Sequence, residues 1–179
     1  MIWPTGLVNR RKIGLRASSF CGSNSSPMEK LDRNFADFLK LLNSHGVEYL
    51  VIGGYAVGYH GFVRATGDLD VFVGISDRNA ERLVAVFREF DFDAPELKKE
   101  LFLEKEKIVR IGLPPLRIEI LTGISCVSFT EAYEKRIEEH IDGVRIAFID
   151  LASLLKNKAA CGRLKDLADI EALTKKKSC

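Results

Sequence analysis

Two aspartates inside an apolar run, Asp68 and Asp70, constrain the fold of this chain more than any other feature of its sequence. Leucine and valine alternate with them over residues 68–73, and successive side chains of a β-strand point to opposite faces. The run therefore predicts a strand whose apolar side chains enter the core while both carboxylates lie together on the other face. Adjacent carboxylates repel each other, and a divalent metal ion between them relieves that repulsion.

A pair of glycines, Gly53 and Gly54, stands upstream of the aspartates and directly after the apolar run 47–52. We expect that run to form a buried strand, which turns at the glycines into a short helix ending near His60. Glycines between a strand and a helix let the backbone approach a phosphate group, whose charge the amides at a helix start favour. The glycines and the aspartates together indicate chemistry on a metal-bound nucleotide.

Length and composition predict one soluble globular domain. At 179 residues the chain can bury a single substantial core, and 46% hydrophobic with 29% charged residues is typical of a globular protein. The four cysteines are scattered, which favours reduced thiols in the cytoplasm over a disulfide framework or a zinc site. No apolar run approaches the roughly 20 residues that a membrane span requires.

Residues 1–27 differ from the rest of the chain, because they hold five serines and four basic residues with no acidic residue. We predict a disordered extension here. It resembles an arginine- and serine-rich transit peptide; the alternative, which we favour, is that the natural start is Met28, directly before the first helical pattern. Without those four positive charges the net charge of +2 becomes −2, which is no general signature of nucleic-acid binding.

The predicted domain covers residues 28–174 and is followed by a basic tail, 175–179. Apolar residues at helical spacing predict an amphipathic helix that starts at Glu29 and ends at a glycine cap, Gly46. Asp142-Gly143 is typical of a two-residue hairpin turn. Further helices are expected over residues 76–90, 96–103, 130–136, 151–157 and 165–173, and further strands over residues 107–111, 116–121, 137–141 and 144–148.

Glu119 lies between two isoleucines of a predicted strand, so we expect a third carboxylate on the polar face of a sheet or, alternatively, a structural ion pair. Arg64 can fork onto phosphate oxygens or form a salt bridge with Asp68 or a neighbour. For three C-terminal cations, Lys158, Arg163 and Lys165, the alternative to phosphate binding is a solvated helix face.

Three further residues have structural interpretations. We expect a hydrogen-bonded structural role for His60, although a catalytic base or metal ligand is the alternative. Thr66 is expected to organise the turn before the strand of the aspartates. Cys161 is expected to be a small packing residue.

The motifs follow one another in a fixed order: Gly-Gly, then Asp-x-Asp on a predicted strand, then a later strand with Glu119. This order resembles the pattern of the DNA polymerase β-like nucleotidyltransferase superfamily. The thirteen-residue spacer between Gly54 and Asp68 lies at the long end of that family pattern. The resemblance implies one α/β domain, with a small, mixed and twisted sheet, helices packed mainly on one face, and the acids on a groove.

A closer resemblance is to the AbiEii-like minimal nucleotidyltransferases of bacteria, many of which belong to toxin–antitoxin or phage-defence pairs. Three blocks carry it and cover most of residues 47–173: GGYAVGYHGFVRATGDLDV, RIEILTGISCVSFTEAY and LLKNKAACGRLKDLADIEAL. Glu119 departs from the pattern, because these relatives more often carry aspartate there.

The resemblance implies metal-dependent transfer of a nucleotidyl group from a nucleoside triphosphate, such as ATP, to an acceptor hydroxyl, with release of pyrophosphate. Asp68, Asp70 and Glu119 are implied to be catalytic and to bind two Mg²⁺ ions, with Mn²⁺ as the alternative metal. The residues implied to contact the nucleotide are Gly53, Gly54, Arg64, Lys158, Arg163 and Lys165.

The acceptor is left open between tRNA, a protein and a small hydroxylated molecule, and the resemblance also implies a cognate toxin or antitoxin as partner. A second hypothesis is a non-catalytic, antitoxin-like module that uses the same fold to bind a partner. A third is a hydrolase that uses the same metals without an acceptor.

Overall fold

The computed structural model describes residues 31–92, 94–113 and 116–175. The extension predicted for residues 1–27 lies outside these ranges, as do residues 176–179 of the predicted tail. Within the described ranges, no helix is both long and apolar enough to cross a membrane.

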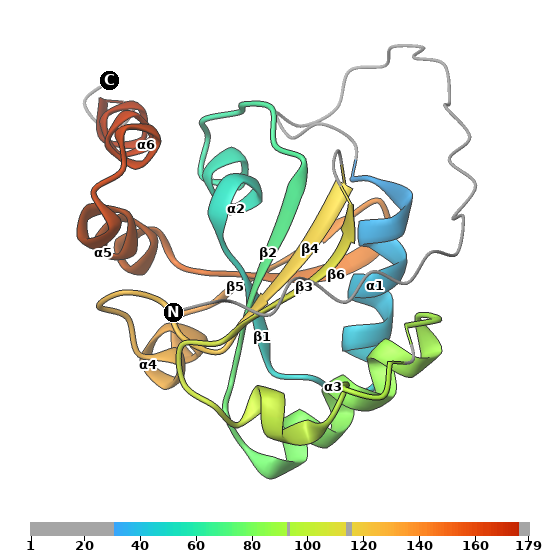
Figure 1. Cartoon of the computed structure of the whole chain (residues 1–179). Coiled ribbons are helices and arrows are strands. Elements are labelled where there is room, and N and C mark those ends of the chain that lie inside the picture. The colour runs from blue at the N-terminus through green and yellow to red at the C-terminus, as the bar shows by residue number, and fades with distance from the viewer. Residues whose placement is uncertain (1–30, 93, 114–115, 176–179) are drawn as a thin grey trace.

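Helices and strands alternate along the described chain around one sheet (Figure 1). The helices are α1 (Arg33–Ser44), α2 (Gly53–Tyr59), α3 (Asp77–Glu89), the 3-10 helix η1 (Lys99–Phe102), α4 (Phe129–Glu134), α5 (Leu151–Cys161) and α6 (Leu164–Lys175). The strands are β1 (Tyr49–Val51), β2 (Asp68–Val73), β3 (Ile108–Leu113), β4 (Leu116–Leu121), β5 (Ile137–Ile141) and β6 (Val144–Phe148).

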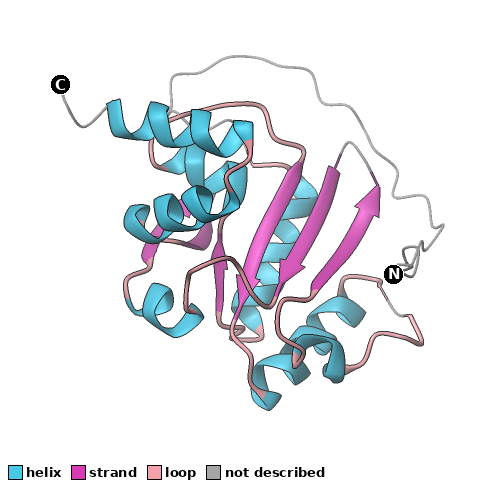
Figure 2. Ribbon diagram, turned by 60° about the vertical axis from the view of Figure 1, so that its left-hand side comes forward, coloured by secondary structure: helices cyan, strands magenta, loops and turns pink. Residues whose placement is uncertain are grey.

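The sheet is six-stranded and mixed, with the order β3-β4-β2-β1-β6-β5. Its central strands combine an antiparallel pair, β1 with β2, and two parallel pairs, β1 with β6 and β2 with β4. Each edge is an antiparallel hairpin, β3–β4 on one side and β5–β6 on the other. Figure 2 shows the twist of this sheet. A mixed sheet with helices packed on it confirms the predicted α/β fold class.

One face of the sheet is apolar because the cross-strand register collects the alternating hydrophobic side chains there. Leu69 pairs with Ile118, and Val71 pairs with Ile120 on β4 and Val51 on β1. All five are at least 96% buried, and each such side chain contributes about 1.5–3 kcal/mol. Helices α1 and α3 cover this face and pack on each other through edge-to-face aromatic rings, those of Phe38 and Phe87.

The opposite face is polar over β2 and β4, where Asp68 and Asp70 lie in register with Arg117 and Glu119. Helix α4 covers this face only further along β2, where the ring of Phe129 packs edge-to-face on Phe72 at 5.1 Å. Helices therefore lie on both faces of the sheet, and Asp68, Asp70 and Glu119 stay partly exposed on the polar face.

Local signals predicted most element ends correctly. Ser76 caps α3 by accepting a hydrogen bond from the backbone N–H of Asn79. Gly46 and Gly162 both adopt φ +64° just beyond the helices α1 and α5. The hairpin turn between β5 and β6 has positive φ at its central Asp142 and Gly143, as a two-residue turn of this type requires.

Two expectations about helices were wrong. The helix predicted over residues 96–103 is only the short η1. Helix α5 continues to Cys161, whose side chain is exposed and therefore does not pack in the core. On α6, Leu167 is 50% exposed and the buried positions are Asp166, Asp169 and Leu173. The aspartates are buried there because cations meet them, a pairing that hydrophobic periodicity does not reveal.

Candidate active site

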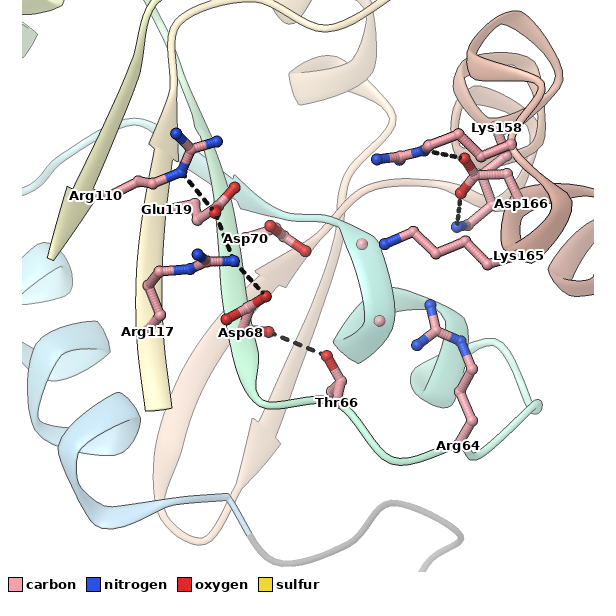
Figure 3. Close-up of a pocket in the computed structure, with 13 residues that line it drawn as sticks. Arg64, Thr66, Asp68, Asp70, Arg110, Arg117, Glu119, Lys158, Lys165 and Asp166 are labelled. Atoms are coloured by element: carbon pink, nitrogen blue, oxygen red, sulfur yellow. Dashed lines mark hydrogen bonds and ion pairs between the residues drawn. The ribbon is translucent and has the colours of Figure 1, made fainter. Parts of the chain in front are cut away.

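A polar pocket of about 260 Å³ lies between the polar face of the sheet, the start of α2 and the helices α5 and α6 (Figure 3). Its lining contains every residue that the sequence singled out as catalytic or nucleotide-binding: Gly53, Gly54, Arg64, Asp68, Asp70, Glu119, Lys158, Arg163 and Lys165. Four segments that are distant in sequence thus meet at one place: the start of α2, the linker into β2, the hairpin β3–β4, and α5–α6.

Asp70 is the most constrained acid of the pocket. It lies directly opposite Glu119 on the neighbouring parallel strand, and Asp68 precedes it by two residues on the same face. Burial, followed by repulsion from Glu119 and from Asp68, raises the pKa of the Asp70 carboxyl to about 6. Lys165 and Lys158 oppose that rise by attraction. The pocket therefore holds a negative charge that its neighbours do not fully compensate.

Gly53 packs directly against this carboxylate. A Cβ atom at Gly53 would lie 1.9 Å from Oδ2 of Asp70, and the backbone there has φ +62°, a conformation that disfavours any side chain. Gly54 is similarly close to the side chain of Thr66, 2.7 Å from a Cβ to Oγ1. Only glycine therefore allows the first turn of α2 to approach Asp70.

Gly53→Ala is expected to destabilise the protein by about 2–3 kcal/mol, because positive φ and overpacking both penalise the new methyl group. Chemical denaturation of the two proteins measures this loss. Gly143→Ala is the matched control, since Gly143 has φ +77° and nothing within 4 Å of its Cβ position. If both variants lost the same stability, the packing of Gly53 on Asp70 would have no energetic weight.

Three of the predicted phosphate-binding cations are held by the two buried aspartates of α6. Arg64 donates from Nε and Nη2 to the two carboxylate oxygens of Asp169, at 2.8 and 3.0 Å. Lys158 Nζ donates to Asp169 at 2.7 Å and to Asp166 at 3.0 Å. Arg163 Nε donates to the other oxygen of Asp166 at 2.6 Å. We call these five residues the α6 ion network.

The α6 ion network keeps its aspartates ionised. Burial by itself would raise the pKa of Asp169, but hydrogen bonds from Arg64 and Lys158 outweigh it and hold that pKa below its usual value. Asp166 is held low in the same way by Arg163 and Lys158. Because three cations meet two carboxylates, the network carries a net positive charge toward the pocket. It also ties α6 to the linker that leads into β2.

Lys165 differs from the other cations. Within the described part of the chain it makes no hydrogen bond or ion pair. Its side chain extends from the start of α6 into the pocket and points toward Asp70, as Figure 3 shows. An unpaired ammonium facing a carboxylate is available to a ligand that carries further negative charge.

Two arginines that the sequence did not single out complete the pocket on the side of the hairpin β3–β4. Arg117 donates from Nη2 to Asp68 at 2.9 Å and lies 3.0 Å from Glu119 Oε1. Arg110 donates from Nε to the same oxygen of Glu119 at 2.9 Å. The alternative interpretation of Glu119, a structural ion pair, thus describes its present contacts, and its role as a metal ligand remains a proposal.

The sequence contained signals for the missed residues. The sequence Gly-Leu-Pro-Pro at 112–115 is a turn signal. Strands β3 and β4 pair Leu113 with Leu116, and counting back from that pair places Arg110 opposite Glu119. Asp166 and Asp169 are three residues apart, so they share one face of a helix. The spacing of Asp166 and Asp169 does not indicate which cations they meet, because Arg64 lies 105 residues away from Asp169.

The structural interpretations of two other residues agree with the structure. His60 Nε2 lies 2.8 Å from the backbone oxygen of Ile149, so it bridges α2 and the segment after β6. Thr66 Oγ1 donates to the backbone oxygen of Asp68 at 3.3 Å and thereby shapes the entry into β2. Arg64 does form a salt bridge, but with Asp169 and not with Asp68.

The donor set fits a divalent metal ion at Asp68 and Asp70. Both offer carboxylate oxygens on one face, and the raised pKa of Asp70 marks a charge that a cation would compensate. With the side chains as they stand, no three His, Cys, Asp or Glu residues of the described chain are grouped to hold a metal ion. Oε1 of Glu119, the third acid of the pocket, is held by Arg110 and Arg117.

The resemblance to nucleotidyltransferases implied three features that the pocket contains. They are paired aspartates on β2, an acid on the parallel neighbour β4, and a Gly-Gly pair at the start of α2. The chain belongs to the family described as nucleotidyltransferase of unknown function (DUF6036), whose model matches residues 29–178. No curated protein matches the chain.

Two solved structures have a similar fold. One is an antigenic nucleotidyltransferase-like protein from Paracoccidioides brasiliensis, with 18% identity over 77% of this chain and 72% of that chain, and a TM-score of 0.48. The other is a candidate nucleotidyltransferase from Thermotoga maritima, with 16% identity over 79% of this chain and 88% of that chain, and a TM-score of 0.47. The assignment of the class rests on the family match.

Proposed function

We propose that this protein transfers a nucleotidyl group from a nucleoside triphosphate to an acceptor hydroxyl. In this reaction the acceptor oxygen forms a bond to the α-phosphorus, the bond between that phosphorus and the bridging oxygen breaks, and pyrophosphate leaves. The hydroxyl proton passes to a base or to solvent. The observation that carries the proposal is that Gly53, Asp70 and Lys165 meet at one pocket. They supply a close backbone approach, a half-buried carboxylate and an unpaired cation.

The triphosphate is assigned to the side of the pocket formed by α2, α5 and α6. Backbone amides at Gly53 and Gly54 have no side-chain cap and no Cβ in the way, so they can approach phosphate oxygens. Lys165 supplies a free positive charge. The α6 ion network, through Arg64, Lys158 and Arg163, adds a net positive field and orients Arg64 and Arg163 at the pocket wall.

Asp68 and Asp70, with Glu119 as third ligand, are proposed to hold two Mg²⁺ ions, with Mn²⁺ as the alternative. When bound, such ions would stabilise both the attacking and the departing oxygen of the displacement. Asp70 is positioned for this by its contact with Gly53 and by the register of β2. Asp68 faces Arg117, which must move for Asp68 to bind a metal ion with the same oxygen.

The finer resemblance to AbiEii-like nucleotidyltransferases belongs to the same proposal. It adds a cognate toxin or antitoxin as partner and ATP among the candidate nucleotides. Incubation of the protein with labelled nucleoside triphosphates and a cell lysate, followed by separation of RNA, protein and small molecules, tests the reaction and shows which class receives the label. Pyrophosphate release without any labelled acceptor would favour the hydrolase alternative.

A non-catalytic partner-binding module is the second candidate. The observation in its favour is that Arg110 and Arg117 already neutralise Asp68 and Glu119. Thermal unfolding with and without Mg²⁺ and each nucleotide separates the candidates, because a ligand of the native state raises its melting temperature. A melting temperature that no Mg²⁺–nucleotide pair changes would favour the module.

Lys165→Gln is expected to raise the KM for the nucleoside triphosphate by roughly tenfold or more, since a hydrogen bond to a charged group contributes about 1.5–3 kcal/mol. The melting temperature should stay nearly constant, because Lys165 is exposed and unpaired among the described residues. Lys156→Gln on α5 is the matched control, an exposed lysine that does not line the pocket. Equal KM values for both variants would contradict the assignment of the triphosphate side.

A further inference from the structure

The cations of the pocket form two separate groups, and the aspartates lie between them. Figure 3 shows Arg110 and Arg117 on the side of β3 and β4, and the cations Lys165, Lys158 and Arg64 on the other side of Asp68 and Asp70. The sheet order agrees, because β4 and β3 lie beyond β2 on the edge that is away from β1 and β6. The pocket thus has two cationic walls, and the triphosphate accounts for only one.

The geometry of the reaction indicates which substrate meets the wall of Arg110 and Arg117. In phosphoryl transfer the attacking and leaving oxygens lie roughly in line on opposite sides of phosphorus. The leaving pyrophosphate belongs to the wall of Gly53 and Lys165 under the proposed function, on which this inference rests. The attacking hydroxyl must therefore enter from the wall of Arg110 and Arg117.

Both guanidinium groups of this wall converge on a single oxygen. Arg110 Nε and Arg117 Nη2 lie 2.9 and 3.0 Å from Glu119 Oε1. The wall is also incompletely satisfied, because Arg117 Nε is buried and has no hydrogen-bond partner. Arg110 is 54% exposed at the rim, on an edge strand of the sheet. Two forked cations around one oxyanion position suit a phosphate group, whose oxygens accept paired N–H bonds.

We propose that Arg110 and Arg117 form the acceptor side of the site and bind a phosphate group next to the attacking hydroxyl. The acceptor is therefore a phosphate-bearing molecule, either a small nucleoside phosphate or the end of an oligonucleotide. A cationic acceptor such as an aminosugar is disfavoured, because it would meet two like charges.

This anion site is linked to divalent cations by charge. Three carboxylates (Asp68, Asp70 and Glu119) outnumber the two arginines, so the acid side of the pocket is net negative as it stands. A divalent ion held by Asp68 and Asp70 would make this side of the pocket net positive, so that Arg110 and Arg117 would be available to a ligand. Binding of the phosphate-bearing acceptor is therefore expected to strengthen when Mg²⁺ is added.

The first test is a choice between acceptors. The full chain, Mg²⁺ and four α-labelled nucleoside triphosphates are incubated in parallel with a short ribo-oligonucleotide, a nucleoside 5′-monophosphate, kanamycin, a neutral disaccharide and an acidic peptide with serine and tyrosine. Label on the oligonucleotide or on the monophosphate supports the proposal and shows which of the two sources is used. Label confined to the last three acceptors overturns it.

The second test separates the two walls with variants. Arg110→Gln is expected to raise the KM for the acceptor by roughly tenfold while the KM for the nucleotide stays within about twofold, and Lys165→Gln is expected to do the reverse. Arg110→Lys keeps the charge without the fork and should fall between. Arg33→Gln, on the 94% exposed Arg33 of α1, is the control. A nucleotide KM that rises together with the acceptor KM in Arg110→Gln overturns the assignment.

Equilibrium binding tests the anion site at Arg110 and Arg117 without any catalytic turnover. Fluorescence anisotropy of a labelled ribo-oligonucleotide and of a labelled nucleoside monophosphate is measured with and without Mg²⁺. The anion site is supported if Mg²⁺ strengthens the binding of either probe and the substitution Arg110→Gln weakens that binding. If the protein binds a probe in this way but consumes no nucleoside triphosphate, the proposed transfer reaction is wrong while the anion site stands. Binding of neither probe, or binding indifferent to Arg110, overturns the inference.

Discussion

Asp70→Asn is expected to abolish nucleotidyl transfer and at the same time to raise the melting temperature of the metal-free protein at pH 7. The loss of transfer should be about a thousandfold or more, because metal ions contribute several kcal/mol of transition-state stabilisation and each 1.4 kcal/mol is tenfold in rate. The gain in stability follows from the pKa of Asp70. Burial, Glu119 and Asp68 raise it to about 6, so the ionised carboxylate destabilises the folded state.

Asp70 stabilises the folded protein less as the pH rises. Between about pH 4 and 6 the folded protein holds a proton on Asp70 that the unfolded chain has lost, so this group's contribution to stability falls as the pH rises through that window. At pH 7 the full penalty applies and amounts to about 3 kcal/mol at most. Asparagine removes the charge, and the variant should therefore be more stable than the wild type at pH 7 and nearly equal to it at pH 4.

Thermal unfolding at the two pH values, together with the labelled-nucleotide assay, checks both halves of this prediction. Asp68→Asn is the matched variant, because it should lose transfer without gaining stability, since Asp68 is paired with Arg117 at 2.9 Å. The double variant should also lose the Mg²⁺–nucleotide shift in melting temperature. An undiminished shift in the double variant would contradict the metal assignment, and a lower melting temperature for Asp70→Asn would contradict the electrostatic argument.

Lys158→Met is expected to lower the free energy of unfolding by about 3–5 kcal/mol, the usual cost of removing one partner from a buried ion pair. Lys158 is 4% exposed, and it touches both Asp166 and Asp169, which are 1% exposed. Without the ammonium group, two buried carboxylates share only Arg64 and Arg163. Urea denaturation with an unchanged m-value measures the loss.

Lys99→Met is the matched control for this variant. Lys99 also meets two carboxylates, those of Asp77 and Glu81, at 3.1 and 3.3 Å, but it does so on the surface. Water screens such pairs, so this substitution should leave the unfolding midpoint nearly unchanged. Similar losses in the two variants would show that burial does not decide the strength of the α6 ion network.

The α6 ion network and Asp70 also respond to pH with opposite signs. The pKa values of Asp166 and Asp169 are held below their usual range, so the stability that the network contributes is present above about pH 4 and is lost as the pH falls further. Asp70, in contrast, favours the folded state as the pH falls toward 4. Comparing the acid unfolding of Asp70→Asn and Lys158→Met separates the two contributions.

Local chemistry explains why much of the fold could be predicted. Strand β2 was predicted with its observed ends because its alternation of aspartates and apolar residues is a period-2 pattern. The turn at Asp142-Gly143 and the cap at Ser76 were found because short polar residues and glycine have fixed roles there. The helix around Glu96 was overestimated because its charged composition contains no strong period.

The sequence by itself determined the glycines and the three acids of the candidate site. Gly53-Gly54, Asp68, Asp70 and Glu119 were identified from spacing and resemblance, because the backbone approach and the strand register that they require are properties of short segments. Only the tertiary structure decided which cations the two aspartates of α6 meet. Arg64 meets Asp169 across 105 residues, because ion pairing depends on distance in space and leaves no period in the chain.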